Sequence, residues 1–436
     1  MTNREAAGNA GFVRAIGRFD LTAAVINGVI GSGIFGLPAI LAATAGTLSP
    51  LAALAAAGGI GLIALCFAEV ASRFREHGGV YLYSRAAYGP LVGFEVGWLL
   101  VWTRLLSAAA NLNLFVLYLA ELWPEVAGGA PRAIVMMGLA GTVAVMNVVG
   151  VRSAARAIDF FTIAKLLPLA LLIVLGLPHL DAATVAGQAV PAPDWSESVL
   201  VLMFALGGFE SALLPAGEMR DPRRDVAFAL LTGLAVVSVV YLLVQVVVIG
   251  TVPHAAGSSA PIADALAALL GPVGLLLGSL GAMVSVVGWM TGAFLGQPRV
   301  IHAMADRGEL PRALAGVHPK FRTPAPAILL FAGVSLALAF AGNFAANATF
   351  AAIVRMVYYG LTCAALIVLR KKGGEPPGFR LRGGPVIAVL AVGFCAWLLA
   401  TRSFEQAWIL AVLIAAGLPF YWFRRRETQS WVQSDK

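Results

Sequence analysis

Residues 27–38 read Asn-Gly-Val-Ile-Gly-Ser-Gly-Ile-Phe-Gly-Leu-Pro and interrupt a long apolar run near the N-terminus. Three glycines and one serine fall within positions 28–33, and both residue types are poor helix formers. Glycine also lets the backbone leave helical angles without steric cost. Residues 204–211, Phe-Ala-Leu-Gly-Gly-Phe-Glu-Ser, interrupt a second apolar run in the same way. The two stretches therefore predict a pair of broken helices.

The composition around these breaks is that of a membrane protein. Of the 436 residues, 60% are hydrophobic and 12% are charged, whereas a soluble domain carries about 25% charged residues. Apolar runs of about twenty residues recur along the chain, and each could cross the roughly 30 Å of bilayer hydrocarbon as a helix. Soluble enzymes, disulfide scaffolds, fibrous proteins and disordered chains are excluded. The cysteines all lie in apolar runs and are expected to pack as small hydrophobic residues.

We predict an all-α integral membrane protein with twelve transmembrane helices. The expected spans are 20–46, 50–72, 90–118, 132–150, 157–177, 196–219, 226–251, 272–303, 325–343, 347–369, 384–401 and 405–423. An even number places both termini on one side of the cell membrane. Nearly all loop lysines and arginines fall on that side, with Arg132 and Arg402 opposite, so the positive-inside rule predicts cytoplasmic termini. Residues 254–270 are too short and polar to span and are expected to form an outer helix.

Broken helices at membrane depth indicate where a ligand would bind. Non-helical backbone is tolerated there only if it lines a cavity or is buried in protein. Each break leaves free N–H groups at the start of one half-helix, which attract a carboxylate, and free carbonyls at the end of the other, which attract an ammonium group. Paired breaks are typical of a binding site between two structural repeats. The alternative is that the glycines only allow close helix packing.

Several motifs together resemble the amino acid–polyamine–organocation permeases. They are Gly-Ser-Gly-Ile-Phe at 31–35, Gly-Gly-Val-Tyr-Leu-Tyr at 78–83, Gly-Phe-Glu-Ser at 208–211 and Asp-Pro-Arg-Arg at 221–224. The resemblance covers nearly the whole chain and implies a five-plus-five inverted repeat of the LeuT type with two further C-terminal helices. The implied segments are a cytoplasmic N-terminal segment at 1–19, repeats at 20–177 and 196–369, two helices within 384–423 and a cytoplasmic tail at 424–436.

The resemblance also implies a substrate site at the two breaks. A substrate carboxylate would meet the backbone N–H groups around Ser32 and Gly33, together with the Ser32 hydroxyl. The α-amino group of the substrate would meet backbone carbonyls of Ile30, Phe204, Ala205 and Gly207.

Side chains of this implied site come from several spans. Phe204 would act as an aromatic gate, and Trp289 matches a pocket tryptophan of the arginine/agmatine-type antiporters that this chain resembles. Gly207 stands where those antiporters have a larger residue, which would alter the pocket. Asn111 and Asn113 lie about 200° apart around a helix, so only one can face the site, and we favour Asn111.

Charged residues within the spans need partners or functions, because a buried charge is costly in a bilayer. The resemblance implies that the Lys165 ammonium bridges the carbonyls of residues 28–31 to the eighth span, with Ser285 as its partner there. Transport would then be sodium-independent, and protonation of Lys165 could couple it to a proton gradient. The alternative is a permanently charged structural tether.

Glu210, which follows the second break, also has two interpretations. The resemblance implies a gating or proton-sensing carboxylate at this position. Alternatively, Glu210 pairs with the in-span Arg104 or Arg355, or accepts hydrogen bonds from nearby backbone.

These observations predict a transporter rather than an enzyme. We expect secondary-active transport of L-amino acids, with neutral substrates favoured, by alternating access and with coupling to protons. The alternative is an obligatory exchanger, including exchange of cationic amino acids or amines, and a channel or membrane-embedded enzyme is a remote alternative. No catalytic, metal or nucleotide-binding motif stands out, so no cofactor is expected. No nucleic acid is expected either, because the basic residues lie in short loops between apolar runs, as topology signals do. The expected partners are the substrate, the bilayer and protons.

Overall fold

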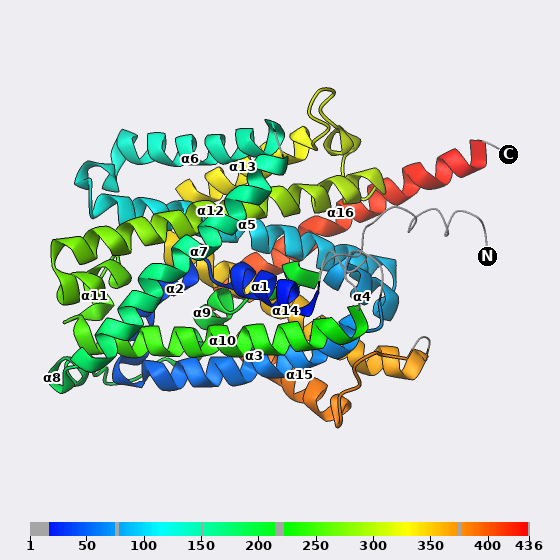
Figure 1. Cartoon of the computed structure of the whole chain (residues 1–436). Helices are drawn as coiled ribbons and strands as arrows, with labels where there is room; N and C mark the ends of the chain where they lie inside the picture. The colour runs from blue at the N-terminus through cyan, green and yellow to red at the C-terminus, as the bar shows by residue number, and fades with distance from the viewer. Residues whose placement is uncertain (1–16, 75–77, 150, 214–221, 374–375, 435–436) are drawn as a thin grey trace.

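The computed structural model describes residues 17–74, 78–149, 151–213, 222–373 and 376–434. Throughout these residues the regular structure is helical, and no strand occurs among them, which confirms the predicted all-α class. The α-helices, shown in Figure 1, are α1 Arg18–Val29, α2 Gly33–Ala45, α3 Ser49–Ala71, α4 Gly79–Tyr88, α5 Pro90–Ala120, α6 Gly129–Val149, α7 Val151–Gly176, α8 Ala182–Ala186, α9 Trp195–Ala205, α10 Pro222–Thr251, α11 Pro261–Leu270, α12 Pro272–Asp306, α13 Ala325–Ala341, α14 Phe344–Lys372, α15 Gly384–Ala400 and α16 Phe404–Ser434.

The helices have the length and apolarity of membrane spans. Within the described part of the chain, 8 helical stretches are long and apolar enough to cross a membrane, and shorter apolar helices accompany them. The chain is therefore a multi-pass membrane protein. A ten-residue helix, α11, lies in the segment 254–270 that was expected to be too short to span. The last helix, α16, continues past the expected span end at 423 to Ser434.

Both predicted breaks are present. The first expected span is divided into α1 and α2, with residues 30–32 non-helical between them. At the second break, α9 ends at Ala205, and a short 3-10 helix, Phe209–Leu213, follows two non-helical glycines. Residues 214–219 of the expected span 196–219 lie outside the described residues. At the start of α9, the Asp194 carboxylate accepts a hydrogen bond from the Glu197 backbone N–H at 2.9 Å, and this bond lowers the pKa of Asp194.

The broken helices lie inside the bundle, as Figure 1 shows for α1 and α9. Helix α1 packs against α10 and the 3-10 helix after α9, while α9 packs against α2, α3 and α14. Small residues allow the surrounding helices to approach closely. At Gly59 of α3, a Cβ would lie 2.1 Å from the Phe394 ring of α15, whereas at Gly61 it would meet nothing within 4 Å. Packing therefore requires a glycine on one face of α3 and not on the other.

A buried carboxylate joins three separate parts of the chain at one end of the bundle. Glu69 at the end of α3 is fully buried. It accepts hydrogen bonds from Arg370 Nε of α14 at 2.7 Å and from the Leu381 backbone N–H before α15 at 2.9 Å. Arg73 adds an ion pair at 3.6 Å. The carboxylate thus stabilises the packing of α3, α14 and the loop that leads to α15.

Replacing Glu69 with alanine is expected to destabilise the fold by about 1–3 kcal/mol, because it leaves the Leu381 backbone N–H and the partly buried Arg370 guanidinium without their carboxylate acceptor. The measurement is thermal unfolding of purified protein in detergent. Glu405→Ala, which removes an exposed carboxylate at the start of α16, is the matched control and should leave the midpoint unchanged. Equal midpoints for the two variants would contradict the role given to Glu69.

Candidate functional site

The two helix breaks touch each other through their backbones. A Cβ at Gly208 would lie 2.5 Å from the Gly28 carbonyl oxygen, and one at Gly33 would lie 2.8 Å from the Ala205 Cα. Gly208 also has φ +109°, a conformation that residues with a Cβ rarely adopt. Glycine is therefore required here both for the backbone angle and for the close approach.

Two adjoining cavities lie at the breaks. The central cavity has a volume of about 20 Å³, which is room for about one water molecule. The vestibule has a volume of about 400 Å³, within the range of small-molecule pockets. Arg104 and Trp289 line both cavities, so the two cavities adjoin at these side chains. A substrate in the central cavity would therefore require movement of the side chains that line it.

The central cavity brings together most of the residues expected to bind substrate. Ile30 is buried but does not line it. Asn111 lines the cavity, whereas Asn113 faces away and its Oδ1 accepts a hydrogen bond from Arg132 at 2.6 Å. The expected residues that line the cavity are Ser32, Gly33, Asn111, Phe204, Ala205, Gly207 and Trp289.

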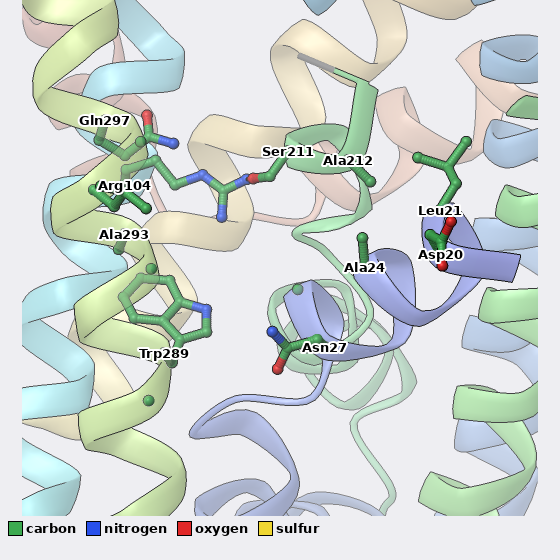
Figure 2. A pocket seen from close by; sticks show the side chains of 15 residues that line it. Asp20, Leu21, Ala24, Asn27, Arg104, Ser211, Ala212, Trp289, Ala293 and Gln297 are labelled. Atoms are coloured by element: carbon green, nitrogen blue, oxygen red, sulfur yellow. The ribbon is translucent and has the colours of Figure 1, made fainter. Parts of the chain in front are cut away.

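The vestibule lies between α1 and α12. Figure 2 shows Trp289, Ala293 and Gln297 on one wall and Asn27 on the opposite wall, with the Arg104 side chain reaching towards Ser211. The vestibule extends to Asp20 near the start of α1. It therefore leads from the central cavity to the end of α1 that adjoins the N-terminal segment.

Lys165 holds the free end of α1. Its ammonium donates hydrogen bonds to the Asn27 carbonyl at 2.9 Å, to Asn27 Oδ1 at 2.5 Å and to the Ile30 carbonyl at 2.6 Å. These acceptors use all three protons of an ammonium group. The expected contact with Ser285 is wrong, since the buried Ser285 hydroxyl has no hydrogen-bond partner among the described residues. Asn27 was not predicted from the sequence as a hydrogen-bond acceptor of Lys165, although it is the first residue of the interrupted stretch 27–38.

Glu210 is held by four donors. Its Oε1 accepts hydrogen bonds from Arg104 Nη2 and the Tyr358 hydroxyl, both at 3.0 Å. Its Oε2 accepts from the Gly208 backbone N–H at 2.9 Å and the Tyr359 hydroxyl at 2.8 Å. The structure thus shows the pairing that was one of the two interpretations of Glu210. The two tyrosines were missed, and the available signal was two adjacent phenols in an apolar run.

Arg355 occupies one of the carbonyls expected to meet the substrate, that of Phe204, and the neighbouring Met203 carbonyl. Its Nη1 donates hydrogen bonds to the Met203 carbonyl at 2.9 Å and the Phe204 carbonyl at 3.0 Å. Its Nε lies 3.9 Å from Glu210 Oε1. The Ala205 carbonyl accepts a hydrogen bond from the Tyr241 hydroxyl at 3.3 Å. In this conformation, side chains of the protein therefore satisfy carbonyls at the end of α9.

Four buried polar atoms of residues that line the central cavity have no hydrogen-bond partner among the described residues. They are Ser32 Oγ, Arg104 Nε, Asn111 Oδ1 and Arg355 Nε. Buried polar groups are normally hydrogen-bonded, so this arrangement suits a polar guest with both donors and acceptors. Within the same described part of the chain, no group of three or more His, Cys, Asp and Glu residues is placed to hold a metal ion.

Comparison with known proteins covers nearly the whole chain. A family model described as amino acid permease matches residues 16–422. The serine/threonine exchanger SteT of Bacillus subtilis is 28% identical over 436 residues, which cover 96% of this chain and 99% of SteT. The branched-chain amino acid permease BcaP of the same organism is 28% identical over 454 residues, with coverage of 96% and 95%. A methylthioribose transporter of this organism is 26% identical over 445 residues, with coverage of 95% and 94%.

Gly33→Ala is expected to impair uptake of a labelled L-amino acid by membrane vesicles. The new Cβ would lie 2.8 Å from the Ala205 Cα, and overpacking of this kind costs about 1–3 kcal/mol, which corresponds to about a five- to hundredfold loss. Gly61→Ala, where the Cβ meets nothing within 4 Å, is the control. Equal uptake by the two variants would show that close approach of the breaks is not required.

Proposed function

Because the chain belongs to the amino acid permease family, we propose that it carries out secondary-active transport of L-amino acids by alternating access, with neutral substrates favoured. The observation that carries this proposal is the pair of touching helix breaks around a cavity lined by the expected binding residues. Free backbone groups at such breaks can bind the carboxylate and the ammonium of one zwitterion. Ser32 and Gly33 are assigned to bind the substrate carboxylate. The uncharged Asn111 and Trp289 are assigned to contact the side chain of the substrate.

We further propose twelve spans, arranged as two inverted repeats and two C-terminal helices, with cytoplasmic termini. The 8 long apolar stretches and the shorter apolar helices support this arrangement. With that orientation, the vestibule at Asp20 opens to the cytoplasm. Phe204 packs edge-to-face against Phe344, with ring centroids 6.4 Å apart, at the end of α14 remote from its basic residues. The described conformation is then inward-facing and closed at its outer end.

Coupling to protons rather than sodium is proposed from Lys165. The ammonium occupies the free carbonyls at the end of α1, where a metal cation would otherwise find its ligands. A fixed positive charge there opposes sodium binding by electrostatic repulsion. Loss of the Lys165 proton would release the carbonyls and loosen the contact between α7 and α1. This provides a physical link between protonation and movement of the broken helix.

Obligatory exchange is the second candidate function. It is favoured by the similarity to SteT, which is named a serine/threonine exchanger. In that case Lys165 is a permanently charged tether and substrate alone drives the change between states. The methylthioribose transporter is similar to this chain at 26% identity, so a substrate other than an amino acid is included in the test.

The test is uptake of labelled L-amino acids and methylthioribose into proteoliposomes without sodium, either empty or preloaded with substrate. Concentrative uptake of amino acids into empty vesicles only when the outside is more acidic supports proton-coupled transport. Uptake only into preloaded vesicles supports exchange. An absolute sodium requirement would contradict the coupling proposal, and inactivity towards every amino acid would contradict the substrate assignment.

Lys165→Met is expected to abolish accumulation driven by a proton gradient, because the variant has no titratable group at the end of α1. Exchange between preloaded and external substrate is expected to continue within about tenfold of the wild-type rate. Lys320→Met, which replaces an exposed loop lysine, should leave both activities unchanged. The measurement compares proton-driven accumulation and exchange in the same vesicles. Undiminished accumulation by Lys165→Met would exclude Lys165 as the coupling group.

A further inference from the structure

We propose that Arg355 is an internal competitor for the ammonium subsite of the substrate and excludes amino acids with cationic side chains. The inference rests on the proposed function, since it concerns which amino acids the central cavity accepts. It assigns a specificity role to a residue on α14, outside both helix breaks.

The Arg355 guanidinium lies at the carbonyl end of α9. Arg355 is 2% exposed, and its Nη1 donates to the carbonyls of Met203 and Phe204 at 2.9 and 3.0 Å. Helix α9 ends at Ala205, so these carbonyls belong to the last turn of a half-helix, where backbone partial negative charge accumulates. A substrate ammonium needs the same kind of acceptor. Arg355 therefore occupies the place that a cation from the substrate would take.

Gly207 provides the space for this arrangement. A Cβ at Gly207 would lie 2.0 Å from Arg355 Nη1 and 2.3 Å from its Cζ. Any side chain at position 207 would therefore displace the guanidinium from the carbonyls. Gly207 and Arg355 act as a complementary pair, in which the guanidinium fills the volume of the missing side chain and reduces the central cavity to about 20 Å³.

Glu210 offers the displaced guanidinium a second partner. Arg355 Nε has no hydrogen bond in the described structure and lies 3.9 Å from Glu210 Oε1. Substrate binding can therefore exchange one set of partners for another: the substrate ammonium takes the Met203 and Phe204 carbonyls while Arg355 turns to the carboxylate. Because every charged group keeps a partner, this exchange avoids the large cost of an unpaired buried charge.

The charge balance determines the substrate class. Arg104 and Arg355 both line the central cavity and share one carboxylate, that of Glu210. Among the described residues that line the two cavities, the one acid is Asp20 at the far end of the vestibule, and Glu210 lines neither cavity. A cationic side chain in the central cavity would thus face uncompensated positive charge. Uncharged side chains avoid this repulsion, and a side chain with an oxygen acceptor can meet the free Nε of Arg104.

The test measures, in proteoliposomes containing the full-length protein, how strongly L-arginine and L-lysine inhibit uptake of the best neutral L-amino acid. The variants are Arg355→Gln, Arg355→Lys and Gly207→Ala, because like-charge contacts in a desolvated site affect selectivity strongly. Arg355→Gln is expected to improve the relative affinity for the cationic amino acids by about tenfold or more. Gly207→Ala, which expels the guanidinium but keeps its charge nearby, is expected to alter the affinity for the neutral substrate by severalfold. Arg355→Lys is expected to keep the exclusion of cations.

Two controls separate specificity from stability. Arg402→Gln removes another buried arginine, which pairs with Glu197 outside the two cavities, and Gly61→Ala adds a methyl group in open space; neither should change the selectivity ratio. If wild-type protein accepts L-arginine as well as neutral substrates, or if Arg355→Gln lowers uptake of all substrates by the same factor, the inference is overturned while the proposed function stands. A wild-type protein that transports no amino acid would overturn the proposed function and this inference together.

Discussion

Backbone polar groups that are released where a helix breaks inside a bilayer must be satisfied by protein groups or by a ligand, since no lipid can do so. The arrangement of the central helices follows from this requirement. At the first break, Lys165 donates to two carbonyls and a side-chain amide. At the second break, Arg355 donates to the last carbonyls of α9. Two cations from distant helices thus stabilise two half-helix ends that attract positive charge.

Arg355 and the neighbouring Arg104 in turn create the need for a buried anion. Glu210 lies directly after the second break and accepts hydrogen bonds from Arg104, two tyrosines and a backbone N–H. The carboxylate joins α5, the 3-10 helix after α9 and α14 around the central cavity. Burial of one acid with two arginines leaves an excess of positive charge near the site. The need to satisfy backbone groups at the helix breaks therefore underlies both the buried ion pairs and the expected selectivity for substrates.

The two cavities relate this network to alternating access. The vestibule is large enough for a small molecule, whereas the central cavity holds about one water molecule. Arg104 and Trp289 line both. Substrate entry consequently requires rearrangement of side chains that also hold the helix ends, so binding energy can act directly on the elements that move. A site built from broken helices combines recognition and movement in the same residues.

The sequence by itself determined the membrane class, the all-helical fold and the positions of both breaks. These features depend on local composition and on the period of a helix, which are readable along the chain. Only the tertiary structure decided that Lys165 binds Asn27 instead of Ser285, and that Tyr358, Tyr359 and Arg355 converge on the second break. Such contacts depend on which long side chains from distant helices reach a given carbonyl or carboxylate, and small changes in helix packing and rotation alter that reach. Helical periodicity describes a face of one helix, whereas a binding site depends on how several faces meet.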